Sequence, residues 1–211
     1  MSVMLKGMKQ SNPFILGIAG GSGTGKSTLA YGIEDKFPDK VVVINLDDYF
    51  LSPDKIPKVN NMTAWDDPAA LDIAGLVRDL TDLKAGKSVT INTKSTRLNP
   101  EFTHTGEKKA VVYEPKPVIV VDGWLLLWFE AVRKLLDFSI YLDAPFELHM
   151  SRRDPSNKQE PFDPVYDELI LKPMHEQYVD RSKQYANIIL DARKLTADAA
   201  LAEAVKHLSV V

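Results

Sequence analysis

The chain has 211 residues, a length that one α/β domain can fill with a sizeable hydrophobic core. Its formal net charge of -3 and its ordinary content of hydrophobic and charged residues exclude a disordered chain and argue against a nucleic-acid partner. The absence of cysteine excludes disulfides and thiolate metal sites, and no apolar run is long enough to span a bilayer, so we expect a cytoplasmic protein with no membrane partner.

The first part of the chain predicts strands that alternate with helices. Residues 14–19 form a short β-type run that leads into glycines, and residues 26–37 have the pattern of a helix. A second apolar strand, residues 41–46, ends on an acidic pair. Residues 53–62 are expected to form a loop. From residue 68 to 83, apolar side chains recur every three residues, which predicts an amphipathic helix.

The middle of the chain repeats this alternation. Residues 89–93 and 110–113 are two short predicted strands around an irregular stretch. Residues 118–121 form a third fully apolar strand, and residues 125–136 are apolar enough for a well-buried helix. A fourth strand is expected at residues 138–142.

The last part begins with a polar, proline-containing segment at residues 154–164, which we interpret as a short lid. Residues 165–185 are predicted to be mostly helical, with a kink or break at Pro173. Residues 188–190 supply a fifth strand, and Thr196 is expected to cap the final helix.

Together these elements predict an α/β fold with a mostly parallel five-stranded sheet and helices on both faces. We expect a single domain over residues 1–211, in which residues 1–13 are a leader. In such a sheet, ligands bind in the crevice at the carboxyl ends of the strands, where the acidic residues of this chain occur.

A glycine-rich segment between the first strand and the first helix satisfies the phosphate-loop pattern of the P-loop NTPase fold: glycine, any four residues, glycine, lysine, serine. Backbone N–H groups of such a loop point at phosphate oxygens, Lys26 supplies charge for the β and γ phosphates, and Ser27 a hydroxyl for Mg²⁺. The alternative interpretation is a plain glycine-rich turn. The predicted strand before the segment and the predicted helix after it favour the phosphate loop, because that motif requires both. We therefore expect ATP to bind at Gly20, Gly21, Ser22, Gly23, Thr24, Gly25, Lys26, Ser27 and Thr28.

Two strand-end carboxylates fit the remaining chemistry. Asp122 follows the third strand and is the best candidate to complete the magnesium site. Asp47 follows the second strand and is expected to accept the proton of an attacking hydroxyl group, and thus to bind the substrate, and to be a further metal ligand. Asp48 is expected to point elsewhere, because neighbours in an extended segment face opposite ways. Each of these residues is alternatively a turn or capping residue.

Arg152 and Arg153 precede the lid, where positive charge helps to close over a transferring phosphoryl group. A solvated surface pair is the alternative interpretation. The four histidines show no metal-ligand spacing.

The chain resembles the uridine kinase and phosphoribulokinase family of P-loop kinases, and also the nicotinamide riboside kinases. Besides the phosphate loop, the likeness rests on residues 47–50, 65–68, 122–123 and 172–189. The resemblance implies that Asp47 is the catalytic base and that Asp66 binds substrate hydroxyls. Tyr49, within the first of these motifs, and Arg97 are further candidate substrate ligands.

Members of the family that act on uridine usually carry a Tyr-Asp pair that reads the pyrimidine, and this chain has Lys94-Ser95 in that place. The insertion at residues 98–109 has no clear counterpart in the family. We therefore expect an ATP-dependent kinase of a small ribosyl or polyol acceptor, with a nucleoside as the first candidate.

Three alternative functions differ in the residues that they require. A kinase of a non-nucleoside alcohol, such as a sugar or a glycerate-like or pantothenate-like acid, fits the missing Tyr-Asp pair. A non-catalytic ATP-sensing module does not need the carboxylates Asp47 and Asp66. A GTP-binding switch is excluded, because the matches at residues 72–75 and 157–160 lie in the wrong context. The sequence leaves the oligomeric state open, a homo-oligomer included.

Overall fold

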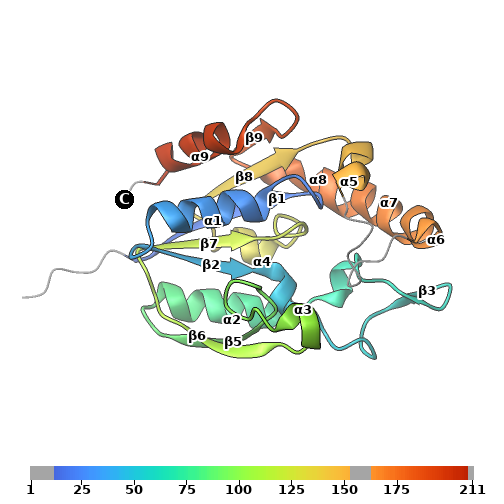
Figure 1. Ribbon diagram of the computed structural model, residues 1–211, viewed down its shortest axis with the longest axis horizontal. Helices are drawn as coiled ribbons and strands as arrows, with labels where there is room; N and C mark the ends of the chain where they lie inside the picture. Colours follow the sequence, from blue (N-terminus) through green and yellow to red (C-terminus); the bar gives the residue numbers. More distant parts are fainter. Residues whose placement is uncertain (1–11, 153–162, 209–211) are drawn as a thin grey trace, which may run out of the picture.

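A five-stranded sheet in which every pairing is parallel runs through the middle of the molecule (Figure 1). The computed structural model describes residues 12–152 and 163–208. The strands lie in the order β2-β7-β1-β8-β9, which confirms the predicted fold class. They are β1 (Phe14–Gly20), β2 (Val41–Asn45), β7 (Val118–Asp122), β8 (Phe138–Asp143) and β9 (Ile188–Asp191).

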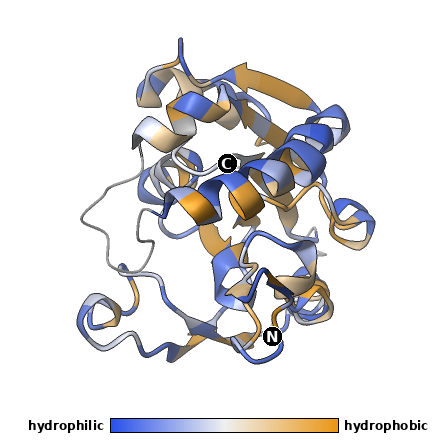
Figure 2. Cartoon of the chain, turned by 90° about the vertical axis from the view of Figure 1, so that its right-hand side faces the viewer, coloured by the Kyte–Doolittle hydropathy of each residue, from blue (hydrophilic) through white to orange (hydrophobic). Residues whose placement is uncertain are grey.

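Helices cover both faces of this sheet, which is why β7 is buried along its whole length and has no polar alternation. On one face, α1 (Lys26–Lys36) and α9 (Ala197–Lys206) pack on the sheet and on each other. On the other face lie α2 (Ile73–Lys84), α4 (Glu130–Arg133) and the helix that follows Pro164. In Figure 2, strand ribbons are largely orange, whereas the helices mix blue and orange turns, as amphipathic helices do.

The predicted helix over residues 68–83 begins later than expected. A 3₁₀ turn, η2 (Pro68–Ala70), comes first, and Asp72 then caps α2 by accepting a hydrogen bond from the Gly75 N–H at 2.9 Å. Leu76, Leu80 and Leu83 are fully buried, whereas Ala74 is exposed. The three-residue spacing was therefore misleading, because a repeat of three drifts off a helical face that turns every 3.6 residues.

The predicted helix over residues 125–136 is wrong for most of its length. Residues 124–128 form turns, and only α4 is helical. Leu125 is completely buried in this turn structure, and the Arg133 guanidinium donates hydrogen bonds to the carbonyls of Leu127 and Trp128 at 2.7 and 2.8 Å. A side chain thus satisfies backbone groups that a helix would have satisfied itself.

The helix expected over residues 165–185 is present, and Pro173 does not break it. Helical dihedral angles continue through Pro173, with a π-helical turn on either side. Its pieces are α6 (Pro164–Tyr166), η3 (Asp167–Leu171), α7 (Lys172–Met174), η4 (His175–Val179), α8 (Asp180–Ser182) and η5 (Lys183–Tyr185). A wider π turn tolerates the missing N–H of proline better than a regular α turn.

Two antiparallel hairpins lie outside the main sheet. The predicted pair β5 (Val89–Thr93) and β6 (Lys109–Tyr113) forms the larger one, with α3 (Phe102–Thr105) in its connection. The smaller one, β3 (Lys58–Val59) with β4 (Met62–Thr63), falls in the expected loop. Asn60 and Asn61 both have positive φ, the conformation of a two-residue hairpin turn. This Asn-Asn pair was the signal in the sequence from which the hairpin could have been predicted.

Helix α5 (Phe146–Arg152) follows β8, as the position of Pro145 predicts. Most of the expected lid, residues 154–164, lies outside the described residues, and so does the predicted leader apart from Asn12 and Pro13. No helix among the described residues is both long and apolar enough to cross a bilayer.

The backbone at Gly20 requires glycine, and this gives a stability prediction. Its φ is +138°, and a Cβ there would run into the Leu142 carbonyl oxygen of β8. We expect Gly20→Ala to lower the free energy of unfolding by about 2 to 4 kcal/mol, from backbone strain and overpacking. Thermal unfolding without ligand measures it.

The control is Gly32→Ala within α1, where a Cβ would only touch Leu201 at 3.8 Å. This change should stabilise the protein by roughly 0.5 to 1 kcal/mol, because alanine favours helix. Equal effects of the two substitutions would contradict the argument.

Candidate active site

A cavity of about 1450 Å³ opens at the carboxyl edge of the sheet. Its lining comes from six parts of the chain: the phosphate loop with the start of α1, the end of β2 and the segment after it, the turn at residues 62–66, the β5–β6 hairpin, the end of β7 with residues 123–124, and the helix that begins at Pro164. Of the site residues predicted from sequence, the structure brings Lys26, Ser27, Asp47, Asp66 and Asp122 to this one cavity, together with Ser22 and Gly23.

The phosphate loop takes a conformation that its glycines make accessible. Gly20, Gly23 and Gly25 all have positive φ, and Gly25 stands at the N-terminus of α1 without any side-chain cap. The first turn of α1 therefore presents its backbone N–H groups and the positive end of the helix dipole toward the cavity. Lys26 Nζ donates to the Gly21 carbonyl at 2.8 Å, which holds the ammonium over the loop.

Ser27 and Asp122 are joined across the sheet edge. The Ser27 hydroxyl donates to Asp122 Oδ2 at 2.6 Å. Asp122 is 5 % exposed, and its Oδ1 has no hydrogen-bond partner within the described structure. Burial raises the pKa of this carboxyl, although the Lys26 charge and the Ser27 hydrogen bond oppose that shift.

This donor set fits Mg²⁺. Mg²⁺ is commonly held by one or two protein oxygens together with water and phosphate oxygens. A buried carboxylate oxygen without a partner, next to a serine hydroxyl, is such a pair of ligands. Among residues 12–152 and 163–208, no group of three His, Cys, Asp or Glu side chains is arranged to hold a metal, so a site built by protein ligands alone is not found there.

Asp47 lies in an ion pair with Lys94, and both side chains line the cavity. Lys94 Nζ is 3.0 Å from Asp47 Oδ2 and 5.4 Å from the centre of the Phe50 ring. The Asp47 side chain is 40 % exposed and that of Lys94 28 %. An ion pair this accessible to solvent contributes little stability, so a ligand can separate the two groups at small cost.

The neighbouring Asp48 also lines the cavity, because the segment is not extended. Residues 46–49 form a 3₁₀ turn, η1 (Leu46–Tyr49), so the rule of opposite faces does not apply. Asp48 is nearly buried, and its Oδ1 accepts the Lys94 N–H at 2.7 Å. Burial raises the pKa of Asp48. Lys108 Nζ donates to the Asp48 carbonyl at 2.8 Å, and burial lowers the pKa of that lysine.

An aromatic wall lies beside these charges. The Phe50 ring stacks on Trp124 at 5.3 Å and meets the edge of Trp65 at 5.4 Å. All three side chains line the cavity. Such a wall offers a flat apolar surface to a planar ring.

The structure does not bring two of the predicted substrate ligands to the cavity. Tyr49 points into the core and donates to Asp79 at 3.0 Å, so its neighbour Phe50 is the aromatic residue at the site. Arg97 forms ion pairs with Glu34 and Asp35 of α1 and is not among the cavity residues. These ion pairs attach the β5–β6 hairpin to α1.

Of the two arginines predicted at the lid, Arg153 lies outside the described residues, and Arg152 ends α5. Their predicted role stays a prediction.

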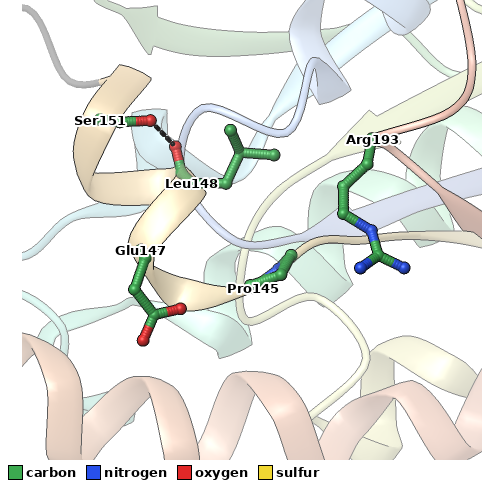
Figure 3. A pocket seen from close by; sticks show the side chains of 5 residues that line it. All are labelled: Pro145, Glu147, Leu148, Ser151 and Arg193. Atoms are coloured by element: carbon green, nitrogen blue, oxygen red, sulfur yellow. Dashed lines mark hydrogen bonds between the residues drawn. The ribbon is translucent and has the colours of Figure 1, made fainter.

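A second, shallower pocket of about 470 Å³ lies at the carboxyl ends of β8 and β9 (Figure 3). Leu148 on α5 points across it toward Arg193, which follows β9. The Arg193 guanidinium is held by two hydrogen bonds to Asp191 at 2.8 and 2.7 Å. The planar guanidinium and the apolar Pro145 and Leu148 are surfaces on which an aromatic ring stacks.

Sequence reasoning missed several residues of the site. Tyr166 donates to Asp66 Oδ2 at 2.7 Å, and no motif marks it. Tyr31 shares a hydrogen bond with Ser95 at 2.9 Å and receives one from Asn45 at 3.1 Å, which ties the hairpin to α1 and β2. Burial raises the pKa of Tyr31. The clustered aromatics and Lys94 were visible in the sequence, but their roles depend on tertiary contacts.

Comparison with known proteins matches residues 15–197 to the model of the Phosphoribulokinase / Uridine kinase family. The chain is 35% identical to a uridine kinase of Tolumonas auensis, over 95% of this chain and 99% of that protein. It is 33% identical to a uridine kinase of Macrococcus caseolyticus, over 85% of this chain and 88% of that protein.

Two solved structures share the fold. One is of a possible uridine kinase from Bacillus stearothermophilus, with a TM-score of 0.60 and 20% identity over 85% of this chain and 89% of that chain. The other is of a putative fructose transport system kinase from a Silicibacter species, with a TM-score of 0.61 and 16% identity over 87% and 92%. At these identities the likeness concerns the fold.

The buried carboxyl of Asp122 should make the ligand-free protein less stable. Because its folded-state pKa is raised, the folded state binds a proton more readily than the unfolded state, and stability falls as pH rises through this range. We therefore expect Asp122→Asn to raise the melting temperature at pH 7 without Mg²⁺ or nucleotide, and this gain to shrink as pH falls. Thermal unfolding between pH 4.5 and 7.5 measures both.

Asp82→Asn is the matched control, because Asp82 pairs with Lys87 on the surface. The argument fails if Asp122→Asn lowers the melting temperature at pH 7.

Proposed function

Because the chain belongs to the Phosphoribulokinase / Uridine kinase family, and is thus an ATP-dependent phosphotransferase that acts on a hydroxyl group, we propose that its acceptor is the ribosyl hydroxyl of a nucleoside. Relatives named uridine kinase over most of the chain support a nucleoside. The observation that carries the proposal is that Asp47 and Asp66 line one cavity with the phosphate loop. We place the enzyme in the cytoplasm, where Mg-ATP is available.

We assign the donor to the phosphate loop and the second pocket. The phosphates of ATP lie over residues 20–28, and Lys26 exchanges the Gly21 carbonyl for phosphate oxygens. The adenine ring stacks at the second pocket, against the Arg193 guanidinium and the apolar Leu148. Ser27 and Asp122 hold Mg²⁺, which supplies charge neutralisation for the transferring phosphoryl group.

We assign the acceptor to the other end of the cavity. Asp47 accepts the proton of the attacking hydroxyl as that oxygen bonds to the γ-phosphorus and ADP leaves. Separating Lys94 from Asp47 opens this carboxylate to the acceptor. Asp66 holds neighbouring hydroxyl groups, and the base stacks on the aromatic wall of Phe50, Trp65 and Trp124. Arg152 or Arg153 adds positive charge from the lid.

A purely regulatory ATP-binding module is disfavoured by the same geometry. Such a module does not need a carboxylate at the acceptor side, yet Asp47 and Asp66 both line the cavity. The size of that cavity, about 1450 Å³, also leaves room for a second substrate besides the ATP phosphates.

One observation favours a second candidate acceptor, an alcohol that carries a carboxylate or a phosphate group. Lys94 and Lys108 both line the acceptor side of the cavity, and the Lys108 ammonium donates a hydrogen bond to the Asp48 carbonyl. Burial lowers the pKa of Lys108, although the charges of Asp48 and Asp47 oppose that shift. An anionic group on the acceptor would stabilise the charged form of Lys108 further and would also draw Lys94 away from Asp47.

The catalytic assignment of Asp47 is tested by Asp47→Asn. We expect turnover to fall about 100-fold or more while ATP binding is kept, because general-base catalysis is lost and the phosphate loop is untouched. ADP release with uridine, cytidine, simple sugars, glycerate and pantothenate measures turnover, and nucleotide titration measures binding. Asp54→Asn, an exposed carboxylate after η1, is the control. Near-normal turnover in Asp47→Asn would rule the assignment out.

The second candidate is tested by Lys94→Met. If the acceptor is anionic, kcat/KM for it should fall roughly 10-fold to 100-fold, the effect of losing a hydrogen bond to a charged group. Turnover of uridine should change little, and Lys87→Met, at the exposed start of the hairpin, should change neither. If every carboxylate-bearing or phosphate-bearing alcohol is inert with the wild-type enzyme, the second candidate is wrong.

A further inference from the structure

We propose that Tyr166 is an acceptor-positioning residue, which orients Asp66 and thereby gives the enzyme its preference for acceptors with two adjacent hydroxyl groups. The Tyr166 hydroxyl donates to Asp66 Oδ2 at 2.7 Å across 100 residues of sequence, and both side chains line the cavity. The inference rests on the proposed function, because it takes Asp66 as the residue that binds acceptor hydroxyls.

Asp66 receives support from outside its own segment. It lies in a turn in which the Asp67 N–H donates to the Ala64 carbonyl at 3.1 Å, between β4 and η2. The next residue, Asp67, uses its side chain to cap η2. Each contact that fixes a carboxylate before the acceptor binds lowers the entropic cost of binding.

Tyr166 is itself held firmly. It lies in the first turn of the helix that begins at Pro164, and Asp163 caps that turn. Asp163 Oδ1 accepts the N–H groups of Val165 at 3.0 Å and of Tyr166 at 3.3 Å. Pro164 presets the backbone at the first helical position. The phenol therefore projects from a capped, regular backbone toward the turn that carries Asp66.

The phenol is also kept in the form that donates. Burial, followed by the charge of Asp66, raises the pKa of Tyr166 far above its usual range. It stays protonated throughout the working pH range and gives its hydrogen to the carboxylate. A hydrogen bond to a charged acceptor is stronger than one between neutral groups.

A fixed carboxylate favours a diol. Two oxygens in one plane can accept hydrogen bonds from two adjacent hydroxyl groups at once, and the Tyr166 bond restrains that plane. An acceptor that lacks one of the two hydroxyls leaves a carboxylate lone pair without its partner, which costs binding free energy. Without Tyr166 the carboxylate turns more freely, and the difference between the two acceptors shrinks.

The test is Tyr166→Phe, assayed with uridine and 2′-deoxyuridine. We expect KM for uridine to rise about 10-fold, with kcat and KM for ATP changed less than 3-fold, because the hydrogen bond acts on acceptor binding. The ratio of kcat/KM for uridine to that for 2′-deoxyuridine should fall by about 5-fold or more. Tyr185→Phe, at the exposed end of the same helix, is the control and should leave both values unchanged.

A double-mutant cycle with Asp66→Asn separates positioning from a general structural effect. If Tyr166 acts through Asp66, Tyr166→Phe should add little to the KM for uridine once Asp66→Asn is present. Additive effects, or equal losses with both acceptors together with a lower melting temperature, would overturn the inference.

The range of alcohols that the wild-type enzyme phosphorylates distinguishes a failure of the proposed acceptor from a failure of the inference about Tyr166. If it phosphorylates no nucleoside but does phosphorylate another alcohol, the proposed acceptor is wrong. The comparison for Tyr166 is then made with that alcohol and its analogue lacking one adjacent hydroxyl. A wild-type enzyme that shows no preference for adjacent hydroxyls overturns the inference about Tyr166 and leaves the phosphotransferase assignment intact.

Discussion

The parallel register of β2, β7 and β1 is the constraint on which the site depends. Asp122 at the end of β7 pairs with Asn45 at the end of β2 on one side and with Ile18 of β1 on the other. This register leaves Asp122 beside the phosphate loop, close enough to accept the hydroxyl hydrogen of Ser27. Asp47, two residues after Asn45, reaches the same edge. Asp122, the phosphate loop and Asp47 thus meet because three apolar strands pair in one direction.

The site keeps charged groups in places that a stable core would avoid. Asp122 and Asp48 are nearly buried, and burial raises the pKa of both carboxyls. Lys108 has its pKa lowered for the same reason. Charged groups that are already fixed in position can interact with the charges of a ligand without rearrangement. Preorganised sites stabilise a transition state in this way. The fold tolerates the destabilisation because two hydrophobic clusters, one on each face of the sheet, surround the edge.

In the proposed function, phosphate chemistry and acceptor choice belong to different parts of the structure. The phosphate loop and Asp122 belong to the central sheet, whereas the acceptor side is assembled from the β5–β6 hairpin, the turn around Asp66 and the helix after Pro164. Arg97 and Tyr31 attach the hairpin to α1, so that Lys94 is held next to Asp47. Such a division lets one scaffold accept different alcohols through changes in peripheral segments.

The sequence by itself determined the five strands, the phosphate loop and the strand-end carboxylates, because apolar runs and glycine spacing are local signals. Tertiary structure decided the rest. The partner of Asp66 lies 100 residues away, which no local pattern encodes. Whether Tyr49 or Phe50 faces the cavity depended on a 3₁₀ turn after β2. Within the non-helical residues 124–128, the carbonyls of Leu127 and Trp128 are bound by the Arg133 side chain. In these segments, local preferences leave several conformations nearly equal in free energy. Tertiary contacts therefore determined which conformation is adopted.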